Sequence, residues 1–76
     1  MGEKKVLRYP ILIEKVEKNY SAYSPDLPGC VATGTTAKLA LSRMKSAIKF
    51  HLEGLKRQGD EIPEPTTRIE YIEIAI

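Results

Sequence analysis

The sequence has one cysteine, one histidine, one phenylalanine and no tryptophan among its 76 residues. Cys30 has no partner within the chain, and one unpaired thiol without a secretory leader indicates a cytoplasmic protein. No apolar run approaches the roughly 18–20 residues that a membrane-spanning helix requires, so we expect no membrane partner. His51 has no second histidine with which to hold a metal, and the chain has no CxxC pair, nucleophile elbow or Gly-rich phosphate loop. We therefore expect no cofactor, no metal and no catalytic residues.

Net charge is also small, since 12 basic and 10 acidic residues leave a formal charge of +2. Its distribution is uneven, because residues 36–57 hold six basic side chains against the single acid Glu53. We expect one domain over residues 1–76, which buries only ~60–65% of the surface of its unfolded chain. A core of that size usually needs a staple or a partner subunit, so we expect a homo-oligomer, either a dimer or a tetramer.

Alternation of apolar and polar residues predicts three strands in the first half of the chain, over residues 5–17, 20–24 and 30–33. In the first of them, every second residue from Leu7 to Ile13 is apolar, and we expect that face to meet the core. Residues 1–4 are expected to be disordered.

We expect Thr36 to cap a helix that begins at Ala37 and is stopped by Gly59. Its apolar residues recur on one broad face, which is typical of an amphipathic helix. Residues 68–76 predict a last strand, and apolar residues on both of its faces indicate that both are covered. The order β-β-β-α-β predicts an α+β fold, in which one helix covers one face of a mainly antiparallel sheet.

The most strongly specified turn is residues 25–30, Pro-Asp-Leu-Pro-Gly-Cys. Pro25 and Pro28 fix φ near −65°, and Gly29 permits the positive φ that a sharp reversal needs. We expect Asp26 to accept hydrogen bonds from backbone amides of its own turn, with contact to a partner as the alternative.

Residues 20–30, Tyr-Ser-Ala-Tyr-Ser-Pro-Asp-Leu-Pro-Gly-Cys, resemble the signature of the HicB family of antitoxins. The resemblance continues through Gly34-Thr35-Thr36, residues 48–55 and residues 62–65, and it covers about residues 9–65. It implies a fold similar to a truncated ribonuclease H domain, associating as a dimer or higher oligomer. It also implies a non-enzymatic role, in which the protein neutralises a HicA-type toxin, a small RNA-cleaving protein, by covering its surface.

Many members of that family carry a further C-terminal DNA-binding domain. The sequence given ends at Ile76, inside the predicted last strand, so we expect no direct DNA binding.

Two groups of residues are predicted to make protein contacts. For the toxin partner we select Tyr23, Asp26 and Leu27, in and before the turn. For self-association we select apolar residues at the flank of the helix and on the last strand, namely Leu39, Phe50, Ile72 and Ile74.

An alternative function is nucleic-acid binding by a line of lysines on the helix, opposite its apolar face: Lys38, Lys45, Lys49 and Lys56. Such a line is more often a solvated helix face, and no aromatic side chain is interleaved to stack on bases.

A vestigial nuclease is the third reading, because ribonuclease H-like folds suggest a carboxylate metal site. Two-metal nucleases need several converging acids. Here Glu14 lies on the outward face of its strand and Asp26 lies in the turn, while Glu70 and Glu73 lie on opposite faces of the last strand. These positions do not predict a catalytic cluster, and Cys30 is expected to be a small buried apolar residue.

Overall fold

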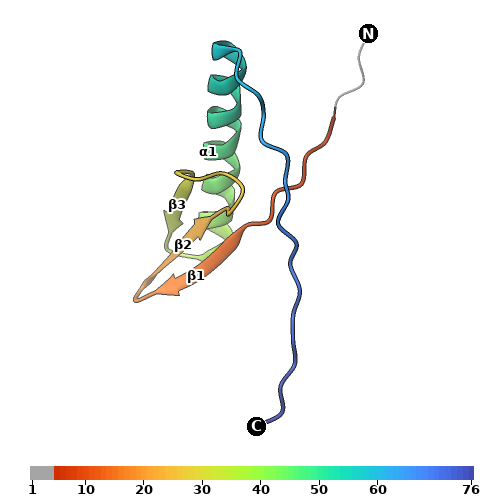
Figure 1. The fold of residues 1–76 in the computed structure, drawn as a ribbon. Helices are drawn as coiled ribbons and strands as arrows, with labels where there is room; N and C mark the ends of the chain where they lie inside the picture. The colour runs from red at the N-terminus through yellow and green to blue at the C-terminus, as the bar shows by residue number, and fades with distance from the viewer. Residues whose placement is uncertain (1–4) are drawn as a thin grey trace.

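The computed structural model describes residues 5–76, so the expected disorder of residues 1–4 lies outside the described part. Three antiparallel strands form one sheet in the order β1-β2-β3, and one helix follows (Figure 1). The elements are β1 (Leu12–Val16), β2 (Asn19–Tyr23), β3 (Val31–Gly34) and α1 (Ala37–Gln58). The predicted α+β class, with strands first and a helix after them, is confirmed.

A tight hairpin joins β1 to β2. Val16 pairs with Asn19 at its closed end and Leu12 pairs with Tyr23 at its open end, so Glu17 and Lys18 alone form the loop. Glu17 has φ 56°, the positive value that the first loop residue takes in the turns favoured by two-residue hairpins.

The first strand is shorter than predicted, because its pairing begins only at Leu12. β2 ends at Tyr23, opposite Leu12, and the chain then turns, so residues 5–11 have no β2 residues across from them. The predicted apolar face is confirmed in part, since Tyr9, Ile11 and Ile13 pack against the core, whereas Leu7 lines an open groove.

Both ends of α1 are capped as the sequence indicates. The Thr36 hydroxyl accepts a hydrogen bond from the Leu39 amide at 3.0 Å. At the other end, Gly59 has φ 76°, and the amides of Gly59 and Asp60 donate to the carbonyls of Lys56 and Leu55. Of residues 5–76, no helix combines the length and apolar character needed to cross a membrane.

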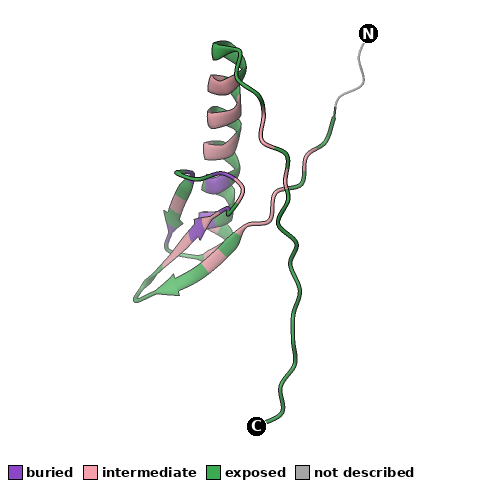
Figure 2. Cartoon of the chain, viewed as in Figure 1, coloured by how far each residue is buried: buried purple, intermediate pink, exposed green. Residues whose placement is uncertain are grey.

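The core lies where α1 meets the sheet and the turn after β2 (Figure 2). Its fully or nearly buried apolar residues are Ala22, Leu27, Cys30, Ala40 and Met44. The helix approaches the sheet closely at Gly34, the last residue of β3, where a Cβ atom would lie 2.7 Å from the Ala40 amide nitrogen.

The predicted last strand does not form within the single chain. Residues 68–76 belong to no helix or strand, and every one of them is exposed (Figures 1 and 2). A strand needs an edge with which to pair, and this segment runs away from the sheet instead. The chain consequently exposes 6735 Å², whereas a compact monomer of this mass exposes about 4700 Å².

Candidate protein-interaction site

The turn between β2 and β3, residues 24–30, is held by its own backbone. The Leu27 amide donates to the Ser24 carbonyl at 3.2 Å, and the Cys30 amide donates to the Leu27 carbonyl at 3.1 Å. Gly29 has φ 88°, as the sequence predicts for the reversal. These bonds give the turn a defined shape in the free chain.

Leu27 is a core residue and not a surface residue, which differs from the predicted role in partner contact. Its side chain is 1% exposed and packs in the cluster that contains Ala40 and Met44. The two backbone bonds of the turn fold Leu27 inward, and burial of a leucine stabilises the fold by roughly 1.5–3 kcal/mol. The surface of the turn is left to Pro25 and Pro28, which are both exposed.

Asp26 binds a distant segment and not its own turn, which corrects the first of the two expectations. Its Oδ1 atom accepts hydrogen bonds from the Thr66 amide and hydroxyl, each at 3.0 Å, and from the Thr67 hydroxyl at 3.1 Å. The bond from the Thr66 amide is the main cause that lowers the pKa of Asp26, and the two hydroxyls add to it. The turn thus anchors the chain about 40 residues further on.

Two further contacts fix the same connector. The Tyr9 hydroxyl donates to the Pro63 carbonyl, and Lys5 Nζ lies 2.7 Å from Glu64 Oε1. Partial burial is the first cause that raises the pKa of Tyr9, followed by the negative charges of Glu64 and Asp26. The connector after α1 is therefore held against residues 5–9 and the turn, and the exposed tail begins just beyond it.

Beside the turn lies a small apolar groove of about 390 Å³. We call its apolar wall the Phe50 surface, formed by the exposed Val31 and Phe50 and the half-buried Ala47 and Leu55. Phe50 is 77% exposed and Val31 is 63% exposed, and Gly29 and Cys30 of the turn line the same groove. Tyr23 lies directly opposite Val31 in the β2–β3 pair and is half-buried. Successive pairs of a sheet face opposite sides, so the Tyr23–Val31 pair lies on the face away from the Ala22–Ala32 pair of the core.

A larger groove of about 1370 Å³ lies on another side of α1. Leu41, Ile48 and Leu52 of the helix form one wall, and Leu7 and Ile11 belong to the other. We call it the basic groove, because it is also lined by all four lysines of the predicted helical line: Lys38, Lys45, Lys49 and Lys56. These lysines border apolar surface instead of lying opposite it. Across residues 5–76, none of the four is in an ion pair.

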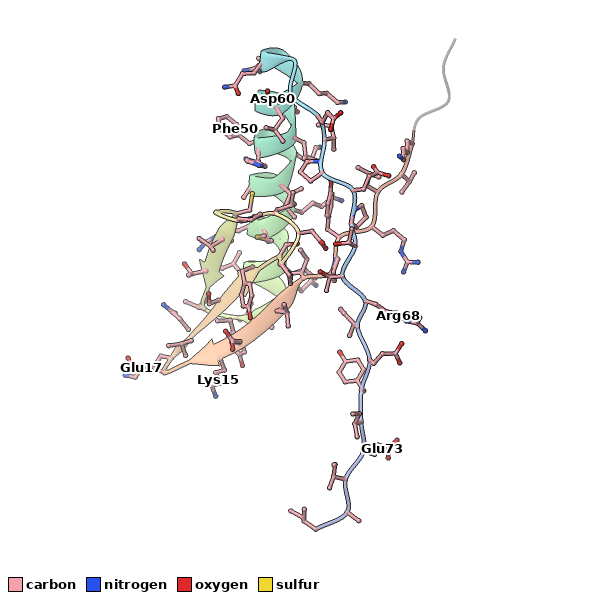
Figure 3. The ribbon with its side chains drawn as sticks, in the orientation of Figure 1. Lys15, Glu17, Phe50, Asp60, Arg68 and Glu73 are labelled. Carbon is pink, nitrogen blue, oxygen red and sulfur yellow. The ribbon has the colours of Figure 1, made fainter. Side chains whose placement is uncertain are left out.

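The structure separates the residues predicted for self-association. Phe50 projects from the helix beside the turn, whereas the tail runs far beyond the other side of the sheet, as the labels of Phe50 and Glu73 show (Figure 3). Ile72 and Ile74 are 82% and 74% exposed, whereas Leu39 is half-buried near Gly34.

Cys30 is buried, as predicted for a small apolar residue. Burial raises the pKa of the Cys30 thiol, which makes the reactive thiolate scarce. Glu14 is exposed on β1. Within residues 5–76, no three side chains of the metal-binding types gather closely enough to hold an ion.

Sequence reasoning missed two features of this surface. The anchoring role of Thr66 and Thr67 has no local pattern, since their partner Asp26 is 40 residues away. The wall of the basic groove formed by Leu7 and Ile11 was read only as a core face, because strand periodicity does not tell a covered face from one left open.

A turn held by its own backbone bonds lies beside exposed apolar surface. Residues 9–75 match the family model described as the HicB-like antitoxin of bacterial toxin–antitoxin systems. The match covers most of the chain, which therefore belongs to this antitoxin family.

Relatives occur in a phage, an archaeon and a bacterium. A 14.9 kDa protein from the rep–hol intergenic region of Haemophilus phage HP1 is 42% identical over 64 residues, which is 84% of this chain and 48% of the phage protein. A UPF0150 protein of Thermoplasma acidophilum is 40% identical over 58 residues, 75% of this chain and 84% of the relative. A UPF0150 protein of Helicobacter pylori is 41% identical over 51 residues, 67% of this chain and 68% of the relative.

The chain thus corresponds to about half the length of the phage relative and to most of the Thermoplasma protein. No solved structure matches the chain significantly.

Proposed function

We propose that this chain is a cytoplasmic antitoxin that binds a HicA-type, RNA-cleaving toxin and masks its RNA-binding surface, without catalysing a reaction itself. The observation that carries the proposal is the family match over residues 9–75, which includes the turn and the whole of α1. Masking requires only a stable complex of complementary surfaces, so no catalytic group is needed.

The toxin contact is proposed at the Phe50 surface together with Tyr23 and the exposed side of the turn. Exposed apolar patches of this kind mark interaction sites in soluble proteins, and Phe50 is 77% exposed. The backbone bonds that shape the turn before binding reduce the ordering cost of association. Asp26 contributes by fixing the turn to Thr66 and lies at the margin of the contact. Leu27 stabilises the turn from within the core.

The test is co-expression of the chain with the small open reading frame beside its gene. We expect the native chain to restore growth and to co-purify with that product. Phe50→Glu places a charge at the centre of the proposed contact and should weaken binding by at least about tenfold, as expected for a central aromatic residue. Lys15→Glu is the matched control, because Lys15 is exposed near the hairpin loop of β1, far from Phe50 (Figure 3).

Absence of a complex together with unchanged growth would overturn the antitoxin role. If the toxin binds the Phe50→Glu chain as tightly as the native chain, the antitoxin role stands but the proposed contact surface is refuted.

Self-association belongs to the same proposal, and we assign fewer contact residues to it than the sequence suggested. Ile72 and Ile74 stay assigned to it because they are exposed on the tail. Phe50 moves to the toxin contact because it lies beside the turn, and Leu39 is half-buried next to Gly34. The excess exposed area of the single chain supports an oligomer.

Nucleic-acid binding stays as a second candidate, favoured by the four lysines of the basic groove. Binding of that kind should weaken steeply with rising salt. If the purified chain retains no RNA or DNA at about 50 mM salt, this candidate is wrong.

A further inference from the structure

Two segments of the chain have the residue pattern of strands but no strand partner. Residues 5–11 run straight into β1, and residues 68–76 form the exposed tail. Both are extended in the structure and neither is paired in the sheet (Figure 1). Each segment therefore offers backbone N–H and C=O groups that a second extended segment can satisfy.

The tail and the basic groove are chemically complementary. The tail presents Ile72, Ile74 and Ile76, all more than 70% exposed, together with the acid Glu73 and with Glu70, which pairs with Arg68 of the same segment at 2.7 Å. The groove offers apolar walls and the four lysines that bind no acid among the described residues. Its own acids have other partners nearby, since Glu64 pairs with Lys5 at 2.7 Å and Glu53 lies 4.0 Å from Arg57.

The lengths also agree. The nine residues 68–76 span about 30 Å when extended. The helix between Lys38 and Lys56 rises by about 27 Å, so the lysines border the groove along the length of such a segment. An occupant of the whole groove therefore needs to be an extended segment of roughly this length.

The tail cannot lie in the groove of its own chain without a reversal just beyond Thr67. The three hydrogen bonds to Asp26 fix Thr66 and Thr67. From there the tail runs away from α1, toward the opposite end of the molecule (Figure 1). A second copy has no such restriction, because its tail can approach from outside.

We propose that two copies of this chain exchange their tails, so that residues 68–76 of each copy lie in the basic groove of the other, beside residues 5–11. The exposed surface exceeds that of a compact monomer by roughly 2000 Å². A stable interface buries about 800 Å² from each partner, which this excess provides. The inference refines the self-association proposed above and does not depend on the toxin.

The test is a disulfide trap between two full-length variants. Ile72 is the central residue of the tail and Ile48 lies midway along the groove, so they approach one another whichever way the tail runs. We expect equimolar Ile72→Cys and Ile48→Cys chains to form a covalent pair on a non-reducing gel under mild oxidation. Ile72→Cys mixed with Lys15→Cys is the control and should form at least about tenfold less, because Lys15 lies outside the groove.

A chain that carries both Ile48→Cys and Ile72→Cys distinguishes exchange from folding back. Exchange predicts covalent dimers, whereas a cross-linked monomer would show that the tail enters its own groove and would overturn the proposal.

Charge reversal gives an independent readout. Lys45→Glu with Lys49→Glu should weaken the dimer by at least about tenfold, and Glu70→Lys with Glu73→Lys should do the same. Mixing these two variants pairs each reversed tail with a reversed groove and should restore association.

A dimer that forms without cross-linking and is insensitive to all four reversals would refute tail exchange while self-association stands. A monomer at every concentration would refute both, and a groove that binds RNA while the chain stays monomeric would favour nucleic acid as its occupant.

Discussion

Gly34 is the residue at which the contact between sheet and helix depends on the absence of a side chain. A Cβ atom there would lie 2.7 Å from the Ala40 nitrogen and 3.1 Å from the Leu39 carbonyl carbon, both backbone atoms that cannot turn aside. We expect Gly34→Ala to lower the free energy of unfolding by about 1–3 kcal/mol, the usual cost of overpacking. Thermal unfolding followed by circular dichroism measures it.

Gly54→Ala is the matched control for this prediction. Gly54 lies within α1 with no neighbouring atom within 4 Å of an added Cβ. It should gain roughly 0.5–1 kcal/mol from better helix propensity. A Gly34→Ala chain as stable as the native chain would show that the strand-to-helix junction is looser than described.

Asp26 should make stability depend on pH. Hydrogen bonds from Thr66 and Thr67 lower the pKa of its carboxyl in the folded chain. Its contribution is therefore complete above the unfolded value of about 4 and is lost as the pH falls through the lower folded value. Asp26→Asn keeps the oxygen acceptor but loses the charge, so it should lower the melting temperature at pH 7 and approach the native chain once the pH falls below the folded pKa of Asp26.

Asp60→Asn is the control for that titration, because Asp60 is exposed just after the helix. An equal gap between native and Asp26→Asn chains at every pH would contradict a role for the carboxylate charge.

Single residues were predictable where local chemistry decides their role. Thr36, Gly29 and Gly59 follow from capping and turn preferences, and all three lie as predicted. The burial of Leu27 was not predictable, because a turn has no periodicity that indicates the direction of a side chain. Asp26 was not, because its partners are distant in sequence.

Among the elements, α1 agrees most closely with prediction, since a helix makes its hydrogen bonds within itself and carries its own end signals. Gly59→Ala tests the end signal. With φ 76°, Gly59 occupies a conformation that disfavours a Cβ, so the substitution should cost about 1 kcal/mol. Chemical denaturation with Gly54→Ala for comparison measures it, and a stabilised Gly59→Ala chain would contradict the cap.

The strands show the limit of the same reasoning. The predicted strands over residues 5–11 and 68–76 do not form in the single chain, because the residue pattern does not say what pairs with these segments. Pairing depends on an edge elsewhere in the fold or in another chain, and local pattern holds no information on it. The same limit applies to the candidate site. Phe50 and Ile72 are both exposed and apolar, but the sequence pattern does not show that they belong to separate surfaces.

At the scale of the whole molecule, the chain exposes more surface than a compact monomer of its mass. Among residues 5–76, the buried apolar core has five members, four of them small or flexible: Ala22, Cys30, Ala40 and Met44, beside Leu27. The open grooves on two sides of α1 are the separate places that we propose for a second copy and for a toxin. Under this proposal, binding covers apolar surface that the single chain leaves exposed.

The claim that the chain self-associates is tested most directly by the mass of the purified chain in sedimentation equilibrium at micromolar concentration. The account predicts a particle of about 17 kDa, twice the 8.5 kDa of one chain, or a multiple of that pair. A stable particle of 8.5 kDa at every concentration, with its full thermal stability, would contradict it.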